Sequence, residues 1–374
     1  MADREQMRGQ PLIVGLALDV SGSMKSNIQN QDVGDVSRLD GLKKAMAALL
    51  AEARRLSAWA GAMDHDRVKL FAYVYGLNIA SVQVCDLFLL LQAWQSVAEQ
   101  AKLAEYRDAL ISHYTSRAAS DRVQLAREVM GSNIASLMFA SEKEAERIVR
   151  NRIEEVITDK VRRRGAGFLI HGLRSIEQVP TTFNLQELAE RWTNVQENFG
   201  FSNPLLGGAT PMKQCLEIIE ARFQQEKAVA RAGTRFVLFI VSDGQSTDGD
   251  PGDAAKRLRD QGVEIASCFV SAADEIPAKE LFEREHKEWG EGAKAMFALA
   301  STISSQSPEG AFLLRGGWRF RKSTVDRWVQ MIGKLFGRNT PDWAKLFAQV
   351  NNSAVLDEFL RVVIAPLYAE HGGE

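Results

Sequence analysis

Residues 11–23 of the chain read PLIVGLALDVSGS, a short apolar run that stops abruptly at Asp19. Continuous apolar runs of this length are typical of strands in a parallel sheet whose two faces are both covered by helices. After Val20, the residues Ser21, Gly22 and Ser23 follow, as expected for a turn. The stretch therefore predicts a buried strand that brings Asp19 to a loop at its carboxyl end.

Other segments repeat this pattern along the chain. Similar apolar runs lie at 68–75, 236–241 and 263–270. Helical periodicity separates the runs, with patterns at 38–60, 211–230 and 251–262. The alternation of strand and helix predicts an α/β fold, a doubly wound and mostly parallel sheet flanked by helices.

A segment at about 86–182 breaks the alternation and predicts a large all-helical insertion. Its helical patterns lie at 89–110, 121–138 and 141–161. Two more amphipathic patterns follow near the end of the sequence, at 325–336 and 356–367. We expect one domain at 10–338, interrupted by the insertion, and a C-terminal helical extension at 339–374.

The composition excludes several function classes. A formal net charge of −2 gives the protein no general attraction for nucleic acid or an anionic membrane. The cysteines Cys85, Cys215 and Cys268 show no C-x-x-C spacing, so neither a zinc site nor a disulfide framework is predicted. The first residues are polar, and the longest apolar stretch is shorter than the ~20 residues of a spanning helix. We therefore expect a cytoplasmic protein.

Polar residues gather at the predicted strand ends. Asp19, Ser21 and Ser23 follow the first strand, and Asp243 follows the run at 236–241. Thr210 ends a glycine-rich loop that precedes a helix. In open parallel sheets, ligands bind at the carboxyl ends of strands where the strand order reverses. Carboxylate and hydroxyl oxygens without His or Cys suit a hard cation, Mg²⁺ first, with Mn²⁺ or Ca²⁺ as alternatives.

The set Asp19-x-Ser21-x-Ser23, Thr210 and Asp243, in this order, resembles the metal-ion-dependent adhesion site of von Willebrand factor type A domains of the intracellular or bacterial type. The resemblance spans about 10–76 and 185–337. It implies that these five residues hold the ion and that a glutamate or aspartate of a partner protein completes its coordination. It also implies a scaffold subunit of a larger intracellular complex, such as an AAA+ ATPase, stress or defence assembly, and not an enzyme.

Six further residues are candidates for the partner surface. They are Gly22, Gly208 and Gly244, beside the expected metal ligands, and the basic cluster Arg162, Arg163 and Arg164. The alternative for the arginines is a solvated helix C-terminus, where positive charge is favourable. If the insertion follows the edge strand, it lies on the side of the metal site, and we expect it to shape or gate partner access.

Two other functions stay open. An aspartate after the first strand of a doubly wound sheet also resembles the site of haloacid-dehalogenase-type phosphatases, which predicts a metal-dependent phosphotransferase or hydrolase. Those enzymes have a second acidic residue two positions later, where this chain has Ser21. Nucleic-acid binding would rest on Arg162–Arg164 alone, within an insertion whose charges nearly cancel.

Overall fold

The structure is a computed structural model of the whole chain. The residues it describes are 11–25, 27–28, 36–37, 40, 43–44, 46–48, 50–51, 68–79, 82–94, 97–131, 133–134, 140–175, 182–198, 206–271, 276–321, 342–350 and 353–361. The predicted helix at 325–336 lies outside them, as does most of the predicted helix at 38–60, whose described positions from 40 to 51 are helical.

A seven-stranded sheet forms the centre of the protein, in the order β13-β8-β7-β1-β4-β5, with β6 also paired to β4. Its parallel strands are β1 (Leu12–Asp19), β4 (Val68–Tyr75), β7 (Arg235–Ser242), β8 (Val263–Val270) and β13 (Phe347–Val350). The antiparallel strands are β5 (Val84–Asp86) and β6 (Phe183–Asn184). This confirms the predicted mostly parallel α/β fold.

Both faces of the sheet are covered, which explains why its strands are apolar throughout. Alternate residues of β1 enter different cores, Leu16 on one face and Ala17 on the other. The core around Ala17 includes residues of α8 (Met212–Val229), α9 (Gly252–Asp260) and α10 (Glu291–Leu299). The core around Leu16 includes residues of α3 (Leu87–Trp94), α7 (Leu185–Asn198), α11 (Pro308–Arg315) and α13 (Ser353–Leu360).

The C-terminal part differs from the prediction of a helical extension at 339–374. β12 (Trp343–Lys345) pairs with β10 (Thr302–Ser304), and β13 pairs in parallel with β8 at the sheet edge. The described part of the chain therefore returns to the main sheet beyond residue 338. All four residues of β13 are buried, Phe347, Ala348, Gln349 and Val350. Burial of consecutive residues fits a strand that is covered on both faces, and not an amphipathic helix with one buried face. Among the described residues of this part, the α-helix is α13, which begins just before the predicted pattern at 356–367 and covers its first residues. The rest of that pattern, beyond 361, lies outside the described residues.

Short strands complete the described structure. β9 (Glu280–Phe282) pairs with β11 (Arg319–Arg321), and β2 (Asn27–Ile28) pairs with β3 (Val36–Ser37). Among the described residues, no helix is both long and apolar enough to cross a membrane.

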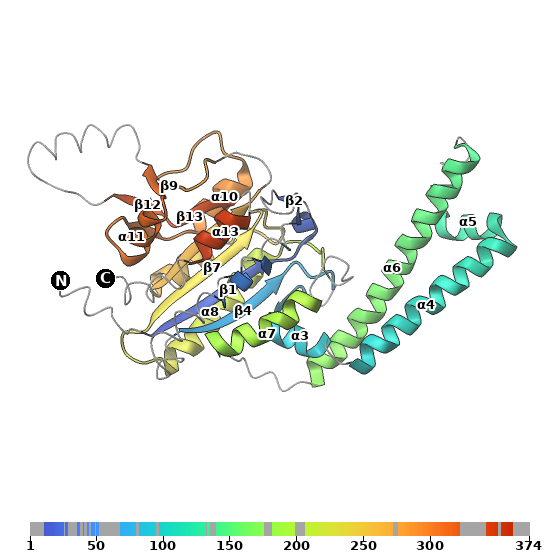
Figure 1. Cartoon of the computed structure of the whole chain (residues 1–374), viewed down its shortest axis with the longest axis horizontal. Helices are drawn as coiled ribbons and strands as arrows, with labels where there is room; N and C mark the ends of the chain where they lie inside the picture. Colours follow the sequence, from blue (N-terminus) through green and yellow to red (C-terminus); the bar gives the residue numbers. More distant parts are fainter. Residues whose placement is uncertain are drawn as a thin grey trace, which may run out of the picture.

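The helical insertion extends away from the sheet as an arm (Figure 1). The arm consists of α4 (Val97–Ser120), α5 (Arg122–Met130) and α6 (Glu142–Ser175). Its small core, which includes Tyr114, Leu125 and Ile157, is separate from the two cores of the sheet. The insertion is thus helical as predicted, but α3 belongs to the layer that covers the sheet, and α6 runs well past residue 161.

Candidate metal-binding site

The candidate site lies where β1 and its neighbours β4 and β7 end. The chain leaves β1 toward β4 on one side, whereas β7 pairs with β1 on the other, so the strand order reverses here. Asp19 is the last residue of β1 and Asp243 directly follows β7. After Asp19 the chain turns through a short 3-10 helix, η1 (Gly22–Lys25), which includes Ser23. The position is the one predicted for a ligand in an open parallel sheet.

Backbone hydrogen bonds join three loops at this edge. The Gly207 N–H donates to the Val20 carbonyl at 2.9 Å, and the Gly22 N–H donates to the Gly208 carbonyl at 3.1 Å. The Gly208 N–H donates in turn to the Gly76 carbonyl at 2.8 Å, in the loop after β4. These bonds fix the serine-containing loop against the loop that leads to Thr210.

Asp19 is a fully buried carboxylate. Its Oδ1 accepts a hydrogen bond from the Ser21 N–H at 2.8 Å, and its Oδ2 accepts one from the Ser242 hydroxyl at 2.6 Å. Burial raises the pKa of Asp19 to about 6, and the charge of Asp243 adds to this, while the bonds from Ser21 and Ser242 act in the opposite direction. Among the described residues, no cationic side chain forms an ion pair with Asp19.

The two serine hydroxyls are adjacent. Ser21 Oγ lies 3.0 Å from Ser23 Oγ. Ser21 is buried and Ser23 is exposed, so this pair of oxygens runs from the Asp19 carboxylate toward solvent. Because Ser21 and Ser23 lie two positions apart in one short turn, their hydroxyls can both face the same ion.

Thr210 and Asp243 complete the predicted set from two other loops. Thr210 is nearly buried, and its N–H donates to the Thr247 hydroxyl at 3.0 Å while the Thr247 N–H donates to the Thr210 carbonyl at 2.9 Å. Asp243 is partly exposed and close enough to Asp19 for its charge to raise the pKa of that carboxyl. The structure thus brings the three loops to one edge.

Two glycines allow the loops to approach so closely. A Cβ at Gly208 would lie 2.3 Å from the Leu77 carbonyl oxygen. Gly244 has a φ of +91°, and a Cβ there would lie 2.3 Å from the Gly292 carbonyl oxygen. A side chain at either position would displace backbone, so these glycines position the loops. For Gly208 and Gly244, two of the three glycines predicted at the partner surface, the structure thus supports a role in positioning the loops.

The donor set fits a hard divalent cation. A buried carboxylate without a cationic partner is costly, and a bound cation removes that cost. The described residues contain no cluster of three or more His, Cys, Asp or Glu side chains. The oxygen donors at this edge are the carboxylates of Asp19 and Asp243 and the hydroxyls of Ser21, Ser23 and Thr210. Such a set would suit Mg²⁺, which prefers oxygen ligands and retains water.

Comparison with known proteins identifies part of the chain. Residues 177–290 match the family model of the von Willebrand factor type A (VWA) domain. We call these residues the VWA segment. It includes Thr210 and Asp243, whereas Asp19, Ser21 and Ser23 precede it in the sequence. No curated protein matches the chain.

Solved structures similar to this chain include proteins from three organisms. Manganese-loaded TRAP protein of Plasmodium vivax is 10% identical, with 70% of this chain and 57% of that chain covered and a TM-score of 0.31. The pilus adhesin SpaC of Lactobacillus rhamnosus GG is 9% identical, with 96% and 31% covered and a TM-score of 0.43. The conserved hypothetical protein BatB of Bacteroides thetaiotaomicron is 12% identical, with 96% and 98% covered and a TM-score of 0.35. The chain thus spans little more than half of the first of these proteins and a third of the second.

Two polar residues near the site have contacts that the sequence analysis did not predict. Ser242, at the end of β7, holds Asp19 through its hydroxyl, which also accepts from the Gly244 N–H at 3.1 Å. Asp248, in the VWA segment, accepts from the N–H groups of Lys213 and Gln214 and so caps α8, the helix that follows Thr210. Ser242 has no clear sequence signal, because a serine next to an aspartate is common. Asp248 has none either, because a side chain that caps a helix from a distant loop leaves no local sequence pattern.

The arginines Arg162–Arg164 lie apart from these residues, within α6. They are not at a helix C-terminus as the alternative interpretation held, because α6 continues to Ser175. Arg162 and Arg163 both pair with Asp159, and Arg164 lies over the Tyr106 ring. Arg162 also donates to the side-chain oxygen of Asn78 at 2.8 Å. Its contacts therefore join the arm to the loop after β4.

Proposed function

We propose that this chain is a metal-dependent protein-interaction module. In this proposal Asp19, Ser21, Ser23, Thr210 and Asp243 hold one Mg²⁺, with Mn²⁺ or Ca²⁺ as substitutes. The bound ion supplies an electrophilic centre that accepts a carboxylate oxygen. A glutamate or aspartate on the surface of a partner protein provides that oxygen.

The observation that carries the proposal is the state of Asp19. Its carboxylate is buried at a strand end, with a hydrogen bond from Ser21 and another from Ser242, and no ion pair with a described cationic side chain balances its charge. Only one further carboxylate of the predicted set, Asp243, lies nearby. Two protein carboxylates neutralise a divalent cation without excess negative charge, so a third carboxylate from a partner is not repelled.

The arm supports a role for the insertion in partner access. Arg162 of α6 contacts Asn78, and the Gly76 carbonyl in the same loop accepts the Gly208 N–H of the loop leading to Thr210. Figure 1 shows the arm leaving the domain on the side where β1 and β4 end. We therefore propose that a partner bound at the metal also passes close to the base of the arm.

The proposal places the chain in the cytoplasm, as a scaffold subunit of a larger assembly such as one built on an AAA+ ATPase, and not as an enzyme. The phosphatase alternative needs an acidic residue two positions after Asp19, and this chain has Ser21 there. This supports the proposal that the chain is not an enzyme. The partner is a protein with an exposed Glu or Asp.

A pull-down from host lysate, read by mass spectrometry, tests this function. The tagged full chain is used in three arms: with Mg²⁺, with EDTA, and as Ser21→Ala with Mg²⁺. The proposal predicts a partner that is retained only in the first arm. A partner retained equally in all three arms would show that the metal residues do not mediate its binding.

A further inference from the structure

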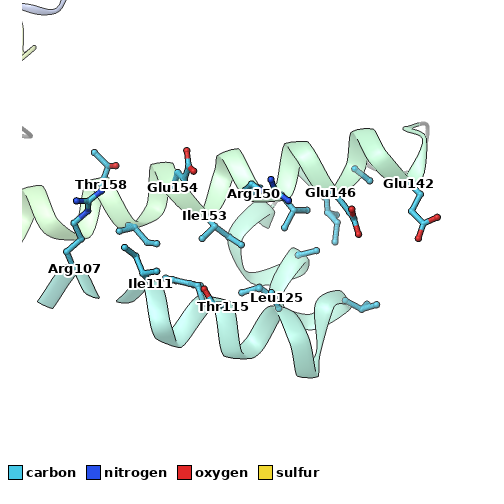
Figure 2. Close-up of a pocket in the computed structure, with 18 residues that line it drawn as sticks. Arg107, Ile111, Thr115, Leu125, Glu142, Glu146, Arg150, Ile153, Glu154 and Thr158 are labelled. Atoms are coloured by element: carbon cyan, nitrogen blue, oxygen red, sulfur yellow. The ribbon is translucent and has the colours of Figure 1, made fainter. Parts of the chain in front are cut away.

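The arm contains a groove that is separate from the strand-end site. Its volume is about 1150 Å³, and α4, α5 and α6 form its walls. Figure 2 shows Ile111 of α4 and Leu125 of α5 on one side and Ile153 of α6 on the other. Drug-sized ligands occupy pockets of roughly 300–1,000 Å³, so the groove is large for a small molecule.

The groove is apolar and incompletely covered. Of the five large apolar side chains that are strongly exposed among the described residues, Ile111 (41% exposed) and Val123 (65% exposed) both line it. α6 has 34 residues and α5 only 9, so α5 covers only a part of the α6 face that turns toward α4. Contiguous exposed apolar surface is a feature of protein-interaction sites.

The shape of the groove fits a helix. Its wall on α6 extends from Glu142 to Thr158, a length of about 24 Å at 1.5 Å per residue. A helix of about 16 residues has the same length and presents an apolar stripe at i, i+3, i+4 and i+7. Such a helix can pack its ridge between α4 and α6, as helices do in bundles and in peptide-binding grooves.

Charge selects among such helices. Glu142 and Glu146 lie together at one end of the groove, at the start of α6, Arg150 and Glu154 follow along the same helix, and Arg107 lies at the other end (Figure 2). A helix with lysine or arginine at the end that meets Glu142 and Glu146 would be oriented by these charges.

We propose that this groove is a second docking site, which binds an amphipathic helix of a partner protein whose one end is basic. The helix buries its apolar stripe against Ile111, Val123 and Ile153, and its basic end faces Glu142 and Glu146. The site needs neither the metal nor the strand-end residues, so it goes beyond the function proposed above.

Fluorescence anisotropy with the full chain and a designed peptide tests the proposal. The peptide is an 18-residue helix with a leucine stripe and three lysines at one end. Saturable binding is expected, and Ile111→Glu should weaken it about tenfold or more, because an apolar contact is replaced by a buried charge. Leu314→Glu is the matched control, since Leu314 is similarly exposed (44%) but lies on α11, and it should leave the affinity unchanged.

Charge variants test the orientation. The double substitution Glu142→Gln and Glu146→Gln should lower the affinity for the lysine peptide about threefold to tenfold. A peptide with glutamates in place of the lysines should bind this variant at least as tightly as it binds the wild type. Circular dichroism of each variant confirms that the helical content is kept. EDTA and Ser21→Ala should leave peptide binding unchanged, because the groove does not include the proposed metal ligands. The groove proposal and the metal proposal can therefore fail independently.

Three results would overturn the proposal. The first is the absence of saturable binding of the lysine peptide to the wild-type chain. The second is binding that Ile111→Glu or the double glutamine variant does not weaken. The third is self-association of the wild-type chain in sedimentation analysis that Ile111→Glu abolishes, because a second copy would then be the occupant of the groove.

Discussion

At the residue scale, the surroundings of Asp19 are the main support for the proposed cation. The fold buries its carboxylate and provides two hydrogen bonds, from Ser21 and Ser242, yet burial raises the pKa of Asp19 to about 6. Hydrogen bonds alone therefore do not offset the loss of water around the charge. At neutral pH the metal-free protein carries an unfavourable buried charge, which a bound cation would neutralise.

We expect Asp19→Asn to stabilise the metal-free protein at pH 7.5 and to abolish the stabilisation by Mg²⁺. The folded pKa of about 6 lies above the ordinary 3.8, so ionisation of Asp19 lowers stability as the pH rises from about 4 to about 6, and the full cost is present above that. Thermal unfolding in EDTA should show a higher midpoint for the variant at pH 7.5 and nearly equal midpoints near pH 4. A variant that is less stable than the wild type at pH 7.5 in EDTA would contradict this account.

The residues of the candidate site differ in how far sequence could predict them. Asp19, Ser21 and Ser23 are close in sequence, and Asp243 ends an apolar run, so their common edge follows from the strand pattern. Ser242 and Asp248 act through contacts between loops that are far apart in the sequence, and their identities alone do not indicate those contacts. For the same reason the Asn78 contact of Arg162 could not be predicted.

At the scale of elements, the loops after β1, β4 and β7 are held together by close backbone contact. Gly244 illustrates this, because its positive φ and its contact with Gly292 both exclude a side chain. A loop with any Cβ at this position would move, and Asp243 would move with it.

Gly244→Ala should therefore destabilise the protein by roughly 2 kcal/mol or more and weaken metal binding. Gly262→Ala is the matched control, since Gly262 also has a positive φ (+79°) but its Cβ would have no neighbour within 4 Å. The control should cost only about 1 kcal/mol and leave metal binding intact. Chemical denaturation and calorimetric Mg²⁺ titration measure the two effects, and equal costs in the two variants would refute the role given to the Gly292 contact.

α6 is an element that the sequence indicated only in part. The helical pattern predicted at 141–161 ends before Gly165 and Gly167, yet the helix continues through both glycines to Ser175. Packing of Ala166 and Ile170 against the sheet core outweighs the low helix propensity of glycine.

Gly167→Ala should stabilise the protein by about 0.5–1 kcal/mol, because Gly167 is helical and a Cβ there would meet no neighbour within 4 Å. Urea denaturation followed by circular dichroism measures the change. A loss of stability would mean that α6 does not persist through this position.

The whole molecule has a two-sided sheet core and a distinct small core in the arm. The four long strands and several of the helices were predictable, because the strands are continuous apolar runs and these helices have apolar residues at helical spacing. β13 was not, because its four buried residues are too few for a clear period and its place at the sheet edge depends on pairing with β8, about 80 residues earlier in the sequence. Nor could the sequence show that α3 packs on the sheet while α4 extends from it.

Replacing residues 115–159 by a short Gly-Ser turn should remove the arm groove and leave the proposed metal site intact. Tyr114 and Lys160 are suitable ends, since the Lys160 ammonium donates to the Tyr114 hydroxyl at 2.8 Å. The truncated chain is expected to bind Mg²⁺ with the wild-type affinity in a calorimetric titration. A large loss of affinity would show that the outer arm contributes to the metal site.

The most direct measurement is a calorimetric titration of Mg²⁺, repeated with Mn²⁺, into the metal-free full chain and into Ser21→Ala and Asp243→Asn. Ser246→Ala is the control, because Ser246 also carries a hydroxyl in the loop after β7 but bonds to Asp248. The account predicts one site per chain in the wild type and in the control, and affinity at least about tenfold lower in both site variants. An absence of binding in the wild type, or equal affinity in all four proteins, would contradict it.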